Sequence, residues 1–73
     1  MRAIPKFCKP LGDSIRSHRK NAGLTQEKLA ELADLNPKYL GEIERAENTI
    51  SLSALVRIAK ALKVRVGDLV ADI

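Results

Sequence analysis

Three capping residues divide this chain of 73 residues into short helical segments, and they constrain its fold more than any other feature. Thr25, Asn36 and Ser51 each stand directly before a stretch whose apolar residues recur every three or four positions. Their side-chain oxygens can accept hydrogen bonds from the free N–H groups of a first helical turn. Because no strand-like alternation is sustained, the pattern predicts an all-α fold made of short helices.

The helices are expected to follow an N-terminal arm at residues 1–10, in which two prolines stand. Gly23 closes the first helix, whose inner face includes Ile15 and Ala22. The fourth helix should bury an apolar face that begins at Leu52. The expected domain covers residues 11–73, with helices at about 11–21, 25–33, 37–45, 52–62 and 66–70.

The third predicted helix is very short, yet its start is carefully specified. Asn36 suits the capping position, and Pro37 suits the first helical position, where its missing N–H costs nothing. A helix of this length is marginal in water, so the rest of the protein must hold it. Glu44 falls on its apolar face, and Arg19 falls on the apolar face of the first helix. Because buried charges are costly unless paired, we expect an Arg19–Glu44 ion pair, the alternative being that either side chain reaches water.

The distribution of charge suggests a polyanionic partner. Residues 1–23 carry six basic residues and one acidic residue, although the net charge of the whole chain is only +4. A basic segment of this kind favours binding to nucleic acid, and the alternative is an ordinary solvated surface. RNA is the less favoured nucleic acid, because a single exposed tyrosine, Tyr39, offers no stacking platform for bases.

No motif indicates catalysis. Cys8 is the single cysteine and is expected to be an inert thiol in the arm, with a redox sensor as the alternative. The sequence has no zinc-ligand spacing, phosphate-binding loop or nucleophile motif, so we expect no enzyme, no cofactor and no metal. No apolar run approaches the ~20 residues that a membrane-spanning helix needs. We therefore expect a cytoplasmic protein with no membrane partner.

The run LTQEKLAELADLNPKYLGEIERAENTISLSALVRIAKAL, residues 24–62, resembles the lambda-repressor-like, Xre-family helix-turn-helix proteins. Within that family the part from NPKYLGEIERAE onward looks most like the small controller proteins of restriction–modification systems. The resemblance implies a five-helix domain that binds double-stranded DNA and regulates transcription. It also implies that helices 25–33 and 37–45 form the helix-turn-helix, with the second entering the major groove.

The resemblance gives each matching position a role. Gln26 matches the glutamine that hydrogen-bonds a phosphate at a helix N-terminus, where the positive end of the dipole favours an anion. Lys38 can donate to guanine O6 or N7, and Glu42 can accept from cytosine N4 or repel phosphates. Tyr39 can contact a thymine methyl or a phosphate. Arg45, Asn48 and Thr49 should hold the DNA backbone at the groove edge, with a base as the alternative contact of Arg45. The expected DNA-binding residues are Thr25, Gln26, Asn36, Pro37, Lys38, Tyr39, Glu42, Arg45, Asn48 and Thr49.

Three positions depart from the family pattern. Asp34 stands where a turn glycine is common, and Ala46 stands where a glycine usually ends the third helix. Both departures concern loop geometry, because residues other than glycine adopt left-handed backbone less easily. Pro37 replaces a residue whose side chain contacts a base in many relatives, so this chain should contact fewer bases there.

An apolar patch near the end of the sequence suggests a partner, and a two-fold homodimer is the commonest solution. A dimer would place two recognition helices about 34 Å apart, so the operator should be a pseudo-palindrome. The alternative is a set of frayed terminal residues. Leu32 is also apolar at an outward position, where Ile4 or Phe7 of the arm would cover it. The expected dimer interface consists of Val66, Val70 and Ile73.

Two other functions are compatible with these patterns. One is an antitoxin-type protein-interaction module that binds DNA secondarily; we expect no segment after the fifth helix to wrap a toxin, which argues mildly against it. The other is the DNA-binding head of a longer regulator. With no sensory domain in the sequence, we expect no small-molecule effector.

Overall fold

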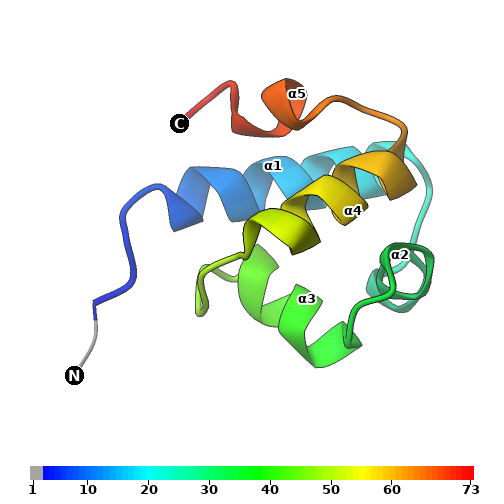
Figure 1. Ribbon diagram of the computed structural model, residues 1–73, viewed down its shortest axis with the longest axis horizontal. Coiled ribbons are helices and arrows are strands. Elements are labelled where there is room, and N and C mark those ends of the chain that lie inside the picture. Colours follow the sequence, from blue (N-terminus) through cyan, green and yellow to red (C-terminus); the bar gives the residue numbers. More distant parts are fainter. Residues whose placement is uncertain (1–2) are drawn as a thin grey trace.

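The computed structural model describes residues 3–73 and shows an all-α domain of five helices (Figure 1). These residues contain no β-strand, so the expected fold class is confirmed. Residues 1–2 of the expected arm lie outside the described part of the chain. The helices are α1 (Cys8–Asn21), α2 (Gln26–Ala33), α3 (Pro37–Glu44), α4 (Leu52–Leu62) and α5 (Val66–Val70).

The three predicted capping residues make the hydrogen bonds that their sequence positions indicate. The Thr25 hydroxyl oxygen accepts from the N–H three residues later, at 3.0 Å, and Ser51 does the same at 3.0 Å. The Asn36 side-chain oxygen accepts from the Lys38 N–H at 2.8 Å. Each bond satisfies a donor that has no partner inside its helix. The starts of α2, α3 and α4 are therefore confirmed.

Helix α1 begins earlier than the sequence predicted, at Cys8 rather than near Leu11. Pro10 had indicated an arm, but it lies in the first turn of α1, where a backbone N–H has no helical partner to lose. The N–H of Leu11 donates to the carbonyl of Phe7 at 3.1 Å, which closes this first turn. Cys8 is only 4% exposed and packs as a small apolar residue, in keeping with an inert thiol.

Each of the first four helices ends at or is followed by a residue with left-handed backbone. These residues are Gly23, Asp34, Ala46 and Lys63, with φ between 55° and 73°. After each of them, the next N–H reaches back to a carbonyl of the last helical turn, at 2.8–3.1 Å. Asp34 and Ala46 therefore keep the turn geometry that glycine would supply, at a steric cost that glycine avoids.

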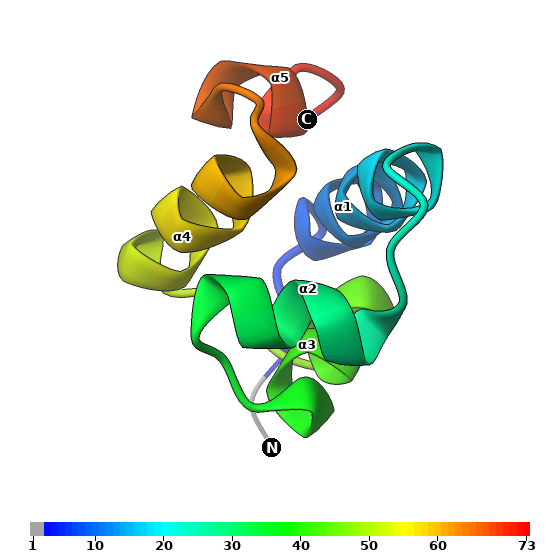
Figure 2. The same ribbon diagram turned by 90° about the vertical axis from the view of Figure 1, so that its right-hand side faces the viewer.

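Each helix contributes one large side chain that is completely or almost completely buried in a single aliphatic core. Helices α2 and α3 cross on one side of α1 and α4, and α5 covers the other side (Figure 2). This arrangement directs one stripe of every helix towards the same interior. The five side chains are Ile15, Leu29, Leu40, Ile58 and Leu69.

Two residues that the sequence placed in the core are exposed instead. Leu52, the first residue of α4, is 73% exposed, because Ala54 takes the buried position in that first turn. Ala22 follows the last residue of α1, where the chain turns into solvent, and it is also exposed. In both cases the apolar periodicity continues beyond the part of the helix that other helices cover.

The arm does not cover Leu32, as the sequence had suggested. Leu32 lies in α2 and is 50% exposed, while Ile4 and Phe7 are themselves 37% and 45% exposed. Figure 1 shows the reason, since the arm leaves α1 at the end of the molecule away from α2. Leu32 therefore remains half-exposed in the described part of the chain.

Candidate nucleic-acid interface

Helices α2 and α3 pack against each other across a turn at residues 34–36. Ala30 is completely buried in α2, and its small side chain permits this close approach. The left-handed Asp34 redirects the chain, and Asn36 then caps α3. The structure thus places two short helices as the predicted helix-turn-helix requires.

The leading end of α3 projects from the molecule. Figure 2 shows this end extending beyond α2, at the bottom of the view. Asn36, Pro37 and Lys38 are exposed there. Among the described residues, the Lys38 ammonium group forms no ion pair. A fixed backbone therefore presents a free cationic donor to solvent.

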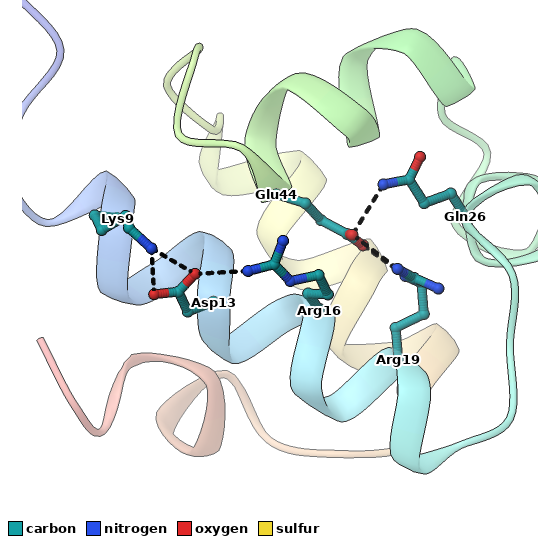
Figure 3. Close-up of polar contacts among 6 residues, drawn as sticks. All are labelled: Lys9, Asp13, Arg16, Arg19, Gln26 and Glu44. Atoms are coloured by element: carbon teal, nitrogen blue, oxygen red, sulfur yellow. Dashed lines mark hydrogen bonds and ion pairs between the residues drawn. The ribbon is translucent and has the colours of Figure 1, made fainter.

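The predicted Arg19–Glu44 ion pair is present and buried, and it ties α1 to the end of α3 (Figure 3). Arg19 Nε donates to Glu44 Oε2 at 2.7 Å, and Arg19 Nη2 donates to Glu44 Oε1 at 3.0 Å. The remaining terminal nitrogen donates to the Leu24 carbonyl at 2.8 Å. This two-point geometry is the strong form of a carboxylate–guanidinium contact.

Gln26 joins the same network, which the sequence did not predict. Its Nε2 donates to Glu44 Oε1 at 3.0 Å (Figure 3). The Glu44 carboxylate, at the end of α3, therefore links the start of α2 to the end of α1. Arg45 also approaches, since a Cβ placed on Gly41 would lie 2.9 Å from Arg45 Nη1 and 3.5 Å from Gln26 Oε1. The absence of a side chain at Gly41 thus leaves room for both polar groups beside α3.

Gly12 sets the distance between α1 and α3. A Cβ at this position would lie 2.5 Å from the carbonyl oxygen of Ile43 and 2.9 Å from that of Glu44. Only glycine permits the two backbones to approach this closely without displacement. This role of Gly12 could not be read from the sequence, because the contact joins residues that are far apart along the chain.

Tyr39 and Glu42, which the resemblance assigns to DNA, both form hydrogen bonds with the loop after α3. The Tyr39 hydroxyl donates to the Thr49 carbonyl at 3.2 Å and accepts from the Ser51 N–H at 3.1 Å. Glu42 accepts a 3.3 Å hydrogen bond from the Asn48 side chain. Both residues are partly buried, and they brace the chain between α3 and α4. The single hydroxyl donor of Tyr39 is therefore already in use.

The residues expected to contact the DNA backbone lie at the end of α3 and in this loop. Arg45 lies at the end of α3 with its side chain 51% exposed, and its Nε donates to Glu47 at 3.0 Å. Asn48 accepts from the N–H of Thr49 at 2.8 Å, which shapes the turn between them. The loop thus brings one exposed cation and two polar side chains to the far end of α3.

The basic N-terminal segment is less free than its composition suggests. Asp13 accepts from Lys9 at 2.8 and 3.0 Å and from Arg16 at 3.0 Å (Figure 3). The hydrogen bond from Lys9 lowers the pKa of the Asp13 carboxyl group below its ordinary value. With Arg19 paired to Glu44, much of the positive charge of α1 is already balanced.

The three residues expected at a dimer interface differ in exposure. Val66 and Val70 are partly buried against the core of their own chain, whereas Ile73 is 57% exposed.

Within residues 3–73, the structure shows no helix long and apolar enough to cross a membrane. The same residues contain no cluster of three potential metal ligands of the His, Cys, Asp or Glu type.

Comparison with known proteins agrees with this geometry. A family model described as helix-turn-helix, HTH_3, matches residues 15–69. Control protein C.SmaI of Serratia marcescens is 42% identical over 59 residues, which cover 81% of this chain and 70% of that protein. The immunity repressor protein of Bacillus phage phi105 is 42% identical over 62 residues, but these cover only 43% of the repressor and 85% of this chain.

A solved structure shows the same likeness in three dimensions. The restriction–modification controller protein C.AhdI from Aeromonas hydrophila superposes with a TM-score of 0.84 at 34% sequence identity. The match covers 85% of this chain and 94% of that one. The chain therefore belongs to the helix-turn-helix family of DNA-binding transcription regulators and has the lambda-repressor-like fold of its Xre-type members.

Proposed function

We propose that this protein binds a pseudo-palindromic operator as a homodimer and regulates transcription, with α3 in the major groove. The observation that carries the proposal is the projecting, capped start of α3, where Lys38 is exposed and Asn36 fixes the backbone. Membership in a family of DNA-binding regulators also means that the chain is no enzyme. We place the protein in the cytoplasm, with the DNA that it would bind.

Base recognition is assigned to the start of α3. Lys38 donates to guanine O6 or N7, and Pro37 keeps the first turn rigid as it enters the groove. Glu42 accepts from cytosine N4 or repels misplaced phosphates, while the ring edge of Tyr39 contacts a thymine methyl. These contacts supply preference among sequences rather than most of the affinity.

Phosphate contacts are assigned to both ends of the helix pair. Gln26 uses one amide hydrogen on Glu44 and keeps the other for a phosphate, beside Thr25 and the positive end of α2. At the other end, Arg45, Asn48 and Thr49 contact the DNA backbone from the loop after α3. Because Glu44 orients Gln26, the buried ion pair also positions a phosphate contact.

The controller role and the dimer rest on separate observations. C.SmaI is named a control protein and C.AhdI a restriction–modification controller, which supports the same role for this chain.

The exposed Ile73, which follows α5, together with Val66 and Val70 on α5, supports a dimer interface there. Leu52 is the more exposed side chain, at 73%, so sedimentation of Ile73→Asp and Leu52→Asp variants compares the two surfaces. A dimer lost only in Leu52→Asp would contradict the α5 interface.

The test of the function is selection of bound duplexes from a randomised pool, followed by fluorescence-anisotropy titration at two salt concentrations. We expect an enriched inverted repeat whose half-sites lie one helical turn apart. The specific complex should also tolerate added salt better than complexes with random duplexes. Weak binding that disappears with salt, with no enriched motif, would contradict the proposal.

A further inference from the structure

A groove of about 530 Å³ lies between the C-terminal ends of α2 and α4. Its floor is apolar: the half-exposed Leu32 lies beside Ala33 and Ala61. The two alanines are small, so the floor leaves room for an apolar side chain from outside the molecule. A concave apolar floor of this kind favours a protein partner that inserts one anchoring side chain.

Basic side chains line the same groove. Arg57 is tied to the end of α2, because its Nη1 donates to the Asp34 carbonyl at 3.1 Å and lies 3.8 Å from the Asp34 carboxylate. Lys60 and Lys63 also line the groove, and neither forms an ion pair with any described residue. The two ammonium groups are therefore available to carboxylates on an incoming chain.

None of the residues that line the groove is assigned to DNA, although Asp34 stands only two residues before Asn36. The proposed phosphate contact at Gln26 lies at the start of α2, whereas Leu32 and Ala33 lie at its end. A helix of this length separates its two ends by roughly 12 Å. Figure 2 shows the end of α2 beneath α4, away from the start of α2 beside α1. The groove is therefore distinct from the phosphate contact assigned to Gln26.

We propose that this groove binds an acidic, amphipathic segment of a partner protein. One apolar side chain of the segment packs on Leu32, Ala33 and Ala61, and flanking carboxylates pair with Lys60 and Lys63. Charge complementarity carries the choice of occupant, since the groove has three basic residues against the single acidic Asp34. A nucleic-acid backbone would gain nothing from the apolar floor, and small aliphatic residues offer no stacking surface for bases.

The test begins with selection of short random peptides displayed on phage against the full chain. We expect the enriched peptides to combine a large apolar residue with flanking aspartates or glutamates. Amide shifts of the isotope-labelled protein, on addition of one such synthetic peptide, should concentrate at residues 32–34 and 57–63. Selection without an acidic–apolar consensus, or shifts confined to other surfaces, would overturn the proposal.

Charge reversal separates this site from general attraction. The double variant Lys60→Glu, Lys63→Glu should bind the selected peptide about tenfold more weakly, and a lysine-substituted peptide should prefer the variant. Lys6→Glu, an exposed reversal in the arm, is the control and should leave peptide affinity unchanged. Affinity of the double variant for random duplex should fall less than its affinity for the peptide, because the reversal removes general positive charge but no assigned phosphate contact. A large loss of duplex affinity, with no loss of peptide affinity, would identify the groove as a DNA surface and overturn the proposal.

Discussion

Replacing Glu44 by alanine tests whether a buried ion pair holds the recognition helix in place. Glu44 accepts hydrogen bonds from Arg19 in α1 and from Gln26 in α2. Without it, the guanidinium of Arg19, whose side chain is 10% exposed, keeps only the Leu24 carbonyl as a partner. Removing one member of a buried pair costs about 3–5 kcal/mol. A chain of this length has a free energy of unfolding of only roughly 4–11 kcal/mol, so the variant should be close to unfolding.

The assay is thermal unfolding followed by circular dichroism. A loss of 3 kcal/mol or more should lower the midpoint by at least about 12 °C in a domain of this size. Glu44→Gln keeps the shape and one acceptor oxygen, so its midpoint should fall between those of the alanine variant and the unaltered protein. Glu31→Ala removes an exposed carboxylate and should change the free energy of unfolding by less than about 0.5 kcal/mol. If the Glu44→Ala midpoint equals that of Glu31→Ala, Leu40 and the other apolar contacts hold α3 alone, and the reasoning is refuted.

Three further predictions concern DNA binding and backbone geometry. Lys38→Ala should cost about 1–3 kcal/mol of binding at the selected operator and relax base preference, whereas Gln26→Ala should weaken binding to all duplexes alike. If Lys38→Ala lost equal affinity for the operator and for random duplex, its assignment to a base would be contradicted. Gly12→Ala should destabilise the fold by about 3 kcal/mol, because its Cβ would lie 2.5 Å from a backbone carbonyl, and urea unfolding should show no such loss for Gly67→Ala, whose Cβ meets nothing within 4 Å. Ala46→Gly should raise the free energy of unfolding by about 0.5–1 kcal/mol, because it relieves a left-handed alanine at φ 58°, and a decrease in urea unfolding would show that this strain is absent.

The starts of helices could be predicted from the sequence because capping is a local interaction. Thr25, Asn36 and Ser51 bond N–H groups only two or three residues away, so the residue type and its position suffice. The ion pair could be predicted for a different reason: two charges on apolar faces each require a partner, and Arg19 and Glu44 have opposite signs. Both inferences need only the residue pattern of each helix by itself, together with one simple rule.

Features that depend on how the helices cross could not be predicted in this way. Gly12 meets the carbonyls of α3 only because α1 lies against them, and its surroundings in sequence do not differ from those of a surface glycine. The exposure of Leu52 depends on how far neighbouring helices extend along α4, which periodicity does not show. Tyr39 is similar, because its hydroxyl bonds to a loop ten residues away. Each of these needs the packed structure.

The contacts that stabilise α3 come from Tyr39 and later residues, and its leading end, residues 36–38, is exposed. Glu44 is buried, Gly12 packs against the last turn, and the Tyr39 hydroxyl braces the loop that follows. By contrast, the Lys38 side chain forms no hydrogen bond with any described residue, and its backbone N–H bonds to the Asn36 cap. An eight-residue helix would be marginal by itself, so this division lets its exposed end vary without loss of the fold. Substitutions at Lys38 should therefore change operator affinity and sequence preference but not stability, whereas substitutions at Glu44 should reduce stability and DNA affinity together.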